Sequence, residues 1–208
     1  MVQQGEPVDT VEGRALPLPG NDIDTDQIIP ARFMKVVTFE GLGQYAFNDA
    51  RWDESGNPKE HPFNEERFQG ASILLVNRNF GSGSSREHAP QALARSGIKA
   101  VVGESFAEIF AGNCTAMGVP AITLPQETIQ KLMRLVEEQP ETWFSIDLRE
   151  NTMTVRVDED SEQYDFDLPP AYRNALLGGT WDSTSVLLSH LDEIRATAEQ
   201  LPYLNNFE

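Results

Sequence analysis

The residues with the clearest chemical potential lie between Asn79 and Ala89, in the run Asn-Phe-Gly-Ser-Gly-Ser-Ser-Arg-Glu-His-Ala. This run follows the apolar residues 73–76 and precedes a helix-like stretch, so it predicts a buried strand, a glycine turn and a helix N-terminus. Such a terminus presents unpaired backbone N–H groups, which suit an anion. Ser84, Ser85 and Arg86 add two hydroxyls and a guanidinium. The sequence therefore predicts a site for an anionic substrate with a candidate base beside it.

Three familiar glycine loops fit this segment less well. A P-loop needs a Lys after its second glycine and a nucleophile elbow needs Gly-x-Ser-x-Gly, and neither pattern occurs here. Gly81 and Gly83 match the dinucleotide fingerprint, and Glu104 follows about twenty residues on, but Arg86 replaces the third glycine. A helix cap without chemistry is the remaining alternative. Two serines followed by Arg-Glu-His disfavour it.

The Asn79–Ala89 segment resembles the active-site loop of the swivelling domain of the aconitase superfamily. Two other segments agree with this resemblance. Residues 21–30 (Asn-Asp-Ile-Asp-Thr-Asp-Gln-Ile-Ile-Pro) are similar to its Asp-Thr-Asp motif, and residues 105–120 to its second helix and following strand. The similarity is greatest to the small-subunit family of bacterial 3-isopropylmalate dehydratases. In that family Cys is frequent at the position of Ser82 and an aromatic residue at that of Ala111.

The resemblance implies a reversible dehydration and rehydration of a 2-hydroxy dicarboxylate, which for isopropylmalate belongs to leucine biosynthesis. The resemblance also implies a separate large subunit that carries a [4Fe–4S] cluster. This chain is expected to be inactive without that subunit. Ser84 matches the family's base, whose alkoxide needs N–H donors and a nearby cation. Arg86 offers a fork for a substrate carboxylate, and Asp26 is the second catalytic candidate. The alternatives are Ser84 as a plain N-cap, Arg86 as a surface charge, and Asp24 and Asp26 as turn formers.

The remaining candidates would bind the substrate. Ser85, which also suits a helix cap, and Thr25 belong to the two motifs already described. Residues 33–37 occupy the place where family members carry a substrate-selecting loop, and they begin with Phe33, Met34 and Lys35. Apolar residues there suit an isopropyl group better than a third carboxylate, which disfavours citrate. Other split hydro-lyases, acting on homoaconitate, citraconate or a dimethylmalate, remain rivals, as does a stand-alone anion- or nucleotide-binding module.

Composition limits the partners of the chain. Its 208 residues are enough for one domain with a full core, and its net charge of -17 argues against nucleic acid and anionic membranes as partners. There is no run of eighteen apolar residues and no N-terminal signal pattern, so we expect a cytoplasmic protein. We expect its partners to be a large subunit and a small dicarboxylate.

Metal ligands are scarce in the sequence. The chain has one cysteine, Cys114, and three scattered histidines. This composition predicts no metal site and no iron–sulfur cluster built by this chain alone. Cys114 lies in a helix-like segment rich in Ala, Phe and Ile, which favours a buried thiol.

Apolar runs that alternate with helical patterns predict a single α/β domain over residues 1–208, a β/β/α sandwich with a mixed sheet and an antiparallel hairpin add-on. The resemblance implies the same swivelling β/β/α fold. An N-terminal tail (1–9) and an exposed excursion (48–68) complete the layout. The expected strands are 10–17, 72–77, 98–103, 119–124, 143–148 and 153–157, with 164–168 as an extension of the hairpin. The expected helices are 86–96, 105–117, 125–138, 169–178 and a final one over 182–201.

Overall fold

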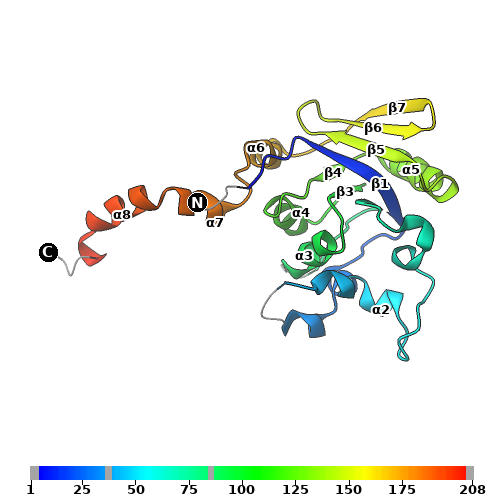
Figure 1. The fold of residues 1–208 in the computed structure, drawn as a ribbon, viewed down its shortest axis with the longest axis horizontal. Helices are drawn as coiled ribbons and strands as arrows, with labels where there is room; N and C mark the ends of the chain where they lie inside the picture. The colour runs from blue at the N-terminus through cyan, green and yellow to red at the C-terminus, as the bar shows by residue number, and fades with distance from the viewer. Residues whose placement is uncertain (1–4, 36–38, 84–86, 205–208) are drawn as a thin grey trace.

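The centre of the molecule is a mixed seven-stranded sheet with the strand order β4-β3-β2-β1-β5-β6-β7 (Figure 1). The structure is a computed structural model that describes residues 5–35, 39–83 and 87–204. The sheet confirms the mixed α/β class expected from the sequence. Its strands are β1 (Thr10–Leu18), β2 (Ile73–Val76), β3 (Ala100–Gly103), β4 (Ala121–Thr123), β5 (Trp143–Asp147), β6 (Thr152–Val157) and β7 (Asp160–Asp165).

Four strands form the parallel half of the sheet, because β1 pairs with β2, β2 with β3, and β3 with β4 in parallel register. Every residue of β2 and β3 is buried, as expected for parallel strands covered on both faces. The ends of these four strands define two edges. We call the edge with their first residues the amino edge and the edge with their last residues the carboxyl edge.

The other half of the sheet is antiparallel, with β1 paired to β5, β5 to β6, and β6 to β7. The third strand was expected at 164–168 but runs over Asp160–Asp165 instead. Residues beyond it leave the hairpin, because Asp167 pairs with Thr123 at the end of β4 through reciprocal backbone hydrogen bonds of 2.9 and 3.0 Å. Exposed acidic residues along β7 protect this sheet edge from pairing with another chain.

The helices cover the sheet and extend beyond it. Helix α5 packs on β1 and β2, α3 packs against α1 and α4, and α4 packs against α6 (Figure 1). The helices are α1 (Thr25–Ile28), α2 (Asn48–Arg51), α3 (His88–Arg95), α4 (Glu108–Thr115), α5 (Gln126–Glu138), α6 (Pro170–Gly178), α7 (Ser183–Ser189) and α8 (Leu191–Glu199).

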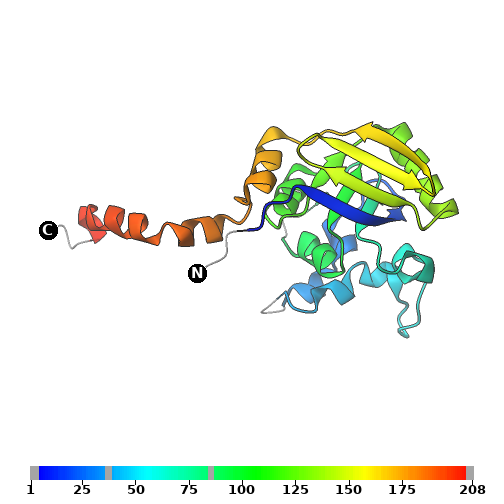
Figure 2. The same ribbon diagram turned by 45° about the horizontal axis from the view of Figure 1, so that its top comes forward.

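The C-terminal region differs from the single helix expected over 182–201. Helices α7 and α8 are separated at His190. The Ser189 hydroxyl donates to the carbonyl of Val186 at 2.7 Å, and the His190 N–H donates to Leu187 rather than to the residue four back. Such local bonds compete with the α-helical pattern. Figures 1 and 2 show both helices extending away from the body of the domain.

Two further segments refine the expected layout. Within 48–68, residues 53–60 are exposed, whereas His61 and Phe68 are buried against the core. In the described part of the N-terminal tail, the Val8 N–H donates to the Leu176 carbonyl of α6 at 2.9 Å. No helix in the described ranges is long and apolar enough to cross a membrane.

Candidate active site

Polar side chains link the loops that follow β1, β2 and β3 at the carboxyl edge. Asn77 accepts from the backbone N–H of Gly20 at 2.9 Å, and its amide donates to Glu104 at 2.8 Å. Since these three residues follow neighbouring parallel strands, the bonds hold the loops side by side. Sequence reasoning missed this role of Asn77 and Glu104. The available signal was a polar residue directly after a buried strand, at the edge where α/β sheets bind ligands.

A second link joins Asp22 to Asn79. The Asn79 side chain donates to Asp22 at 2.8 Å, and its backbone N–H donates to the Ser105 hydroxyl at 2.9 Å. Asp22 and Asn79 have φ angles of 58° and 56°, a left-handed conformation that Asp and Asn adopt more readily than most residues. The hydrogen bond from Asn79 lowers the pKa of Asp22, and Arg78, 3.3 Å away, adds to the effect. The Asp22 carboxylate is therefore held in its charged form.

Backbone hydrogen bonds bring the two predicted motifs into direct contact. The N–H of Gly81 donates to the carbonyl of Ile23, and the N–H of Thr25 donates to the carbonyl of Ser82, both at 2.8 Å. On the other side, the backbone of Phe80 pairs with the loop after β3. The first residues of the Gly-Ser loop therefore lie between the loop that follows β1 and the loop that follows β3.

Helix α1 places the Asp-Thr-Asp motif beside this loop. Asp24 is its N-cap and forms a capping box with Gln27, with two hydrogen bonds of 2.8 Å. Thr25 is buried, and Asp26 is exposed in the first turn. Asp24 therefore has a structural role, as the cap of α1, in line with the turn-forming role considered for Asp24 and Asp26. Asp26 presents its carboxylate at the surface of the carboxyl edge.

Gly81 permits the close approach of this loop to α4. Its φ angle is 78°, and a Cβ at this position would overlap the ring of Phe110. Phe110 in turn packs edge-on against Phe80, with ring centroids 5.3 Å apart. A side chain at position 81 would therefore displace the loop or the helix behind it.

The central candidates Ser84, Ser85 and Arg86 lie outside the described residues. The described chain stops at Gly83, whose φ angle is 100°, and resumes at Glu87, just before α3. The positions of both flanking residues are consistent with the predicted order of strand, glycine turn and helix. The roles assigned to the three residues between them stay predictions.

The start of α3 is stabilised by side-chain contacts. Glu87 accepts from the Gln91 amide at 2.7 Å, and the Gln91 oxygen accepts from Arg95. His88 packs edge-on against Phe39, with ring centroids 5.1 Å apart. These contacts order the helix that follows the Ser-Ser-Arg run.

The predicted substrate-selecting residues begin in a 3-10 helix, Ala31–Lys35. Phe33 stacks on Tyr45, with centroids 4.2 Å apart and planes 12° from parallel. Met34 is half-buried and Lys35 is exposed. Val36 and Val37, the rest of the predicted loop, lie outside the described residues.

Arg32 adjoins this loop and forms a two-point ion pair with Asp49. One guanidinium nitrogen donates to the carboxylate at 2.8 Å and the other contacts the second oxygen. The guanidinium carbon also lies 4.6 Å from the Phe33 ring centroid. The hydrogen bonds from Arg32 lower the pKa of Asp49 to about 2. The charge of Arg32 is therefore balanced by a carboxylate of the same chain.

The described residues do not gather metal ligands, since no three His, Cys, Asp or Glu side chains among them form a candidate metal site. The Cys114 thiol is fully buried in α4, and this burial strongly raises its pKa. A neutral, buried thiol is a poor ligand for an iron–sulfur cluster. These residues do not fit a cluster held by this chain.

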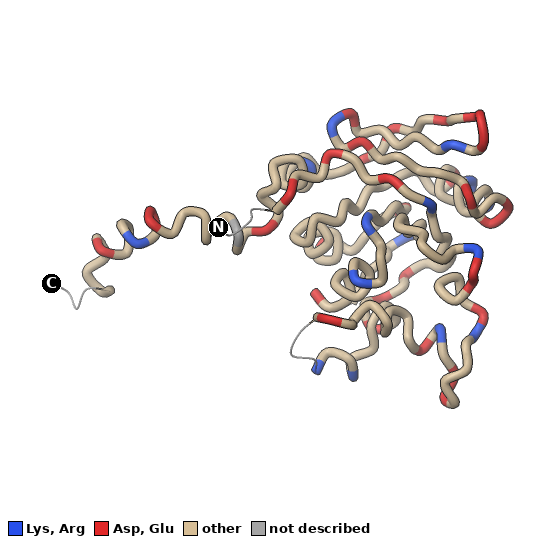
Figure 3. The backbone as a smooth tube through the Cα atoms, viewed as in Figure 1, with Lys and Arg blue, Asp and Glu red and all other residues tan. Residues whose placement is uncertain are grey.

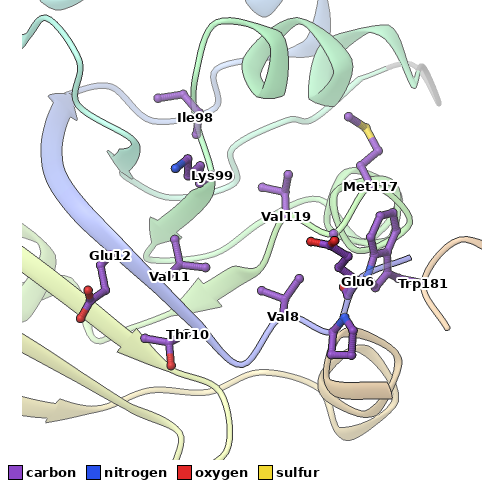
Figure 4. Close-up of a pocket in the computed structure, with 12 residues that line it drawn as sticks. Glu6, Val8, Thr10, Val11, Glu12, Ile98, Lys99, Met117, Val119 and Trp181 are labelled. Atoms are coloured by element: carbon purple, nitrogen blue, oxygen red, sulfur yellow. Dashed lines mark hydrogen bonds between the residues drawn. The ribbon is translucent and has the colours of Figure 1, made fainter. Parts of the chain in front are cut away.

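The amino edge has a separate cavity of about 450 Å³. Figure 4 shows Thr10 and Glu12 of β1, Lys99 just before β3, and Trp181 around it. The cavity lies at the opposite ends of the parallel strands from the linked loops. It has no residue in common with the predicted site.

Comparison with known proteins agrees with the motifs. A family model described as the aconitase C-terminal domain matches residues 6–127. A 3-isopropylmalate dehydratase small subunit from Thermus thermophilus is 52% identical over 193 residues, which cover 93% of this chain and 94% of that protein. The protein of the same name from Synechocystis is 48% identical and covers 95% of this chain and 96% of its own length.

The fold also has a counterpart among solved structures. A 3-isopropylmalate dehydratase from Methanocaldococcus jannaschii superposes with a TM-score of 0.61, over 88% of this chain and 99% of that one. The two chains are 24% identical, so this likeness supports the fold.

Proposed function

The chain belongs to the family of 3-isopropylmalate dehydratase small subunits, and we propose that it supplies the proton-transferring half of a two-subunit, cytoplasmic hydro-lyase. One observation carries this proposal. The Asp-Thr-Asp motif and the Gly-Ser loop are far apart in sequence but are joined by the Gly81–Ile23 and Thr25–Ser82 hydrogen bonds at the carboxyl edge. In this proposal, 2-isopropylmalate and 3-isopropylmalate are interconverted through the alkene.

The reaction breaks a C–O bond and the C–H bond on the adjacent carbon, and rehydration forms them again with the positions exchanged. Ser84 takes the proton from the carbon next to a carboxylate and later returns a proton to the neighbouring carbon. A serine can act so only if N–H donors and a cation stabilise its alkoxide, which a helix N-terminus and Arg86 supply. A Lewis acid for the leaving hydroxyl is what a [4Fe–4S] cluster on the large subunit supplies when bound.

The other candidates orient the substrate. Arg86 binds a substrate carboxylate through two parallel hydrogen bonds, and Ser85 adds a hydroxyl contact at the edge of the loop. Thr25, predicted as a further contact, is buried and holds the loop through its backbone N–H to Ser82. Asp26 orients the reacting groups from the first turn of α1. The linked loops support this assignment, because a base must be held in place before the substrate arrives.

Substrate choice follows from the residues around Phe33. The Phe33–Tyr45 stack and the half-buried Met34 offer apolar surface to a branched alkyl group. Arg32, the cation beside this apolar surface, is paired with Asp49 of the same chain. We therefore propose that isopropylmalate is preferred over tricarboxylates such as homoaconitate.

The experiment that tests this function compares Ser84→Ala with Lys99→Ala in the complex reconstituted with the large subunit. Loss of a general base lowers turnover by about 10²–10⁴-fold, so we expect a kcat decrease of that size for Ser84→Ala. Lys99 lines the amino-edge cavity and should leave kcat within about twofold. Near-normal turnover of Ser84→Ala, with the same subunit pairing, would contradict the assignment of the base.

A further inference from the structure

A small cavity of about 280 Å³ lies between the C-terminal end of α3 and the segment that leads into β2. Its walls come from the end of α3, the 3-10 helix Leu42–Tyr45, Arg51, and the residues just before β2. We call it the α3 cavity. It has no residue in common with the linked loops of the carboxyl edge, so the proposed function assigns it no role.

The α3 cavity differs in charge from the rest of the molecule. The chain has 33 acidic and 16 basic residues, and Figure 3 shows the acidic ones spread over the described backbone. Four larger cavities in the described part of the chain each include at least one Asp or Glu. The lining of the α3 cavity includes none, but it contains Arg51 and Arg95. The Arg95 guanidinium already donates to Gln91, which leaves Arg51 as the principal cation.

Arg51 is half-buried, and no carboxylate in the described ranges forms an ion pair with it. The acidic residues close to it in sequence are engaged elsewhere, because Asp49 pairs with Arg32 and Glu65 pairs with Arg67. Burial lowers the pKa of Arg51, but an arginine stays charged at physiological pH. A partly buried charge is costly without a counter-ion. The cavity therefore lacks an anion among its own residues.

The Arg51 guanidinium is held in a fixed orientation. Its Nε donates to the Asn64 side-chain oxygen at 2.9 Å, and its Nη1 donates to the Ala46 carbonyl at 3.2 Å. The guanidinium carbon also lies 5.8 Å from the ring centroid of Phe63. Among the described residues, Nη2 has no hydrogen-bond acceptor. One arm of the fork is therefore positioned for a ligand before the ligand arrives.

Neutral donors complete the lining. The side-chain amides of Gln44 and Gln69 belong to it, and the Gln44 side chain makes no hydrogen bond to a described residue. The C-terminal carbonyls of a helix repel an anion. In α3, however, the carbonyls of residues 92–94 accept hydrogen bonds from the backbone N–H groups of residues 96–98. The end of the helix is thus capped, and its opposition to an anion is reduced.

We propose that the α3 cavity binds a small tetrahedral oxyanion of the phosphate class, with the Arg51 guanidinium as its main contact. A guanidinium fork matches phosphate geometry, and the oxygens of a phosphate can accept from several donors at once. A volume of about 280 Å³ is below that of pockets for drug-sized ligands, so the ligand is a free phosphate or a small phosphate monoester. The bound anion links Arg51 to the end of α3 and stabilises the packing between them.

The test measures thermal unfolding and calorimetric binding of the full chain with inorganic phosphate, glycerol phosphate and malonate, at constant ionic strength. Arg51→Gln removes the guanidinium. Gln44→Glu is nearly isosteric and adds a carboxylate to the lining, while the Arg51 bonds to Ala46 and Asn64 stay in place. The matched controls, Arg156→Gln and Gln130→Glu, make the same charge changes at exposed residues outside the cavity.

At about ten times its Kd, phosphate should raise the Tm of the wild type and of both controls by about 3–6 °C. The two cavity variants should bind phosphate about tenfold more weakly or worse, because a charged hydrogen bond is lost or a repulsion is added. If Arg51→Gln does not fold, Gln44→Glu decides the question alone.

An equal response to glycerol phosphate assigns the site to a phosphate monoester, and a response to inorganic phosphate alone assigns it to the free ion. The proposal fails if the wild type does not bind phosphate. It also fails if both cavity variants bind phosphate as the wild type does, or if malonate binds as tightly as phosphate.

Discussion

The two edges of the parallel half of the sheet differ in how their loops are held together. At the carboxyl edge, three loops are joined by backbone and amide hydrogen bonds, and Asp22, Asn79, Gly81 and Gly83 adopt left-handed conformations. At the amino edge, a cavity of about 450 Å³ is lined by dispersed side chains. This hollow therefore lies away from the predicted chemistry.

This difference shows what each edge can do alone. A reaction needs groups fixed in place before the substrate binds, and the linked loops provide that rigidity beside a cavity of about 770 Å³ that Ser105 and Thr123 help to line. In the proposed function, the carboxyl edge is half of a site that the large subunit completes. The amino-edge cavity offers volume without converging donors.

Changes at Gly81 should break the carboxyl edge. Gly81→Ala introduces a strained φ angle and an overlap with Phe110, which together should cost roughly 2–5 kcal/mol of unfolding free energy. Gly56→Ala is the matched control, since Gly56 has the same φ angle of 78° but open space around it. That change should cost about 1–2 kcal/mol. Urea denaturation measures both, and equal losses would show that the loop does not depend on close packing at position 81.

Acid should weaken the packing around His61, which lies behind helix α1. His61 packs on Phe47, whose N–H donates to the end of α1. Burial lowers the pKa of His61 from 6.5 to about 4, with a further contribution from Arg51 and an opposing one from Glu65. Because the unfolded chain takes up the His61 proton more readily than the folded chain, the free energy of unfolding falls as the pH drops. The contribution of neutral His61 is complete above pH 6.5 and is lost as the pH falls towards 4.

Between pH 7 and pH 5 this loss should amount to about 1–2 kcal/mol. His61→Asn can still accept the hydrogen bond from Phe63 that His61 accepts at 3.2 Å, but it does not titrate. The variant should therefore lose less stability over the same pH range. An unchanged pH dependence in thermal melts at the two pH values would remove His61 from this account.

The smallest effect is expected on substrate choice. Met34→Arg adds a cation to the apolar loop and should shift the ratio of the two kcat/KM values towards homoaconitate and away from isopropylmalate by about 5–10-fold, or roughly 1 kcal/mol. Lys35→Arg, which adds no charge, is the control. If Met34→Arg leaves the ratio as it is in wild type, substrate choice is made by the large subunit.

The elements and the site differ in how far the sequence could predict them. Apolar runs such as Ile73–Val76 predicted the parallel strands, because burial on both faces leaves little choice of residue type. The third strand of the hairpin was misplaced, since Asp160–Asp165 is polar and exposed and carries no apolar pattern. The break at His190 coincides with a local hydrogen bond from the Ser189 hydroxyl to the Val186 carbonyl, which apolar periodicity does not register.

Resemblance to a family identified the motifs of the site, but spacing alone could not bring them together. The contact between Asp22 and Asn79 depends on the parallel pairing of β1 with β2 and on left-handed backbone at both residues. The same holds for Asn77 and Glu104, whose hydrogen bond exists only once β2 and β3 are neighbours. Such links are properties of the folded sheet.

The most direct test of the central claim is the activity of this chain reconstituted with its large subunit on isopropylmalate, citraconate and homoaconitate. We expect turnover only when both subunits are present, iron that co-purifies with the large subunit alone, and the highest kcat/KM for isopropylmalate. A complex that is inactive on all three substrates, or stoichiometric iron bound to the isolated chain, would contradict the account.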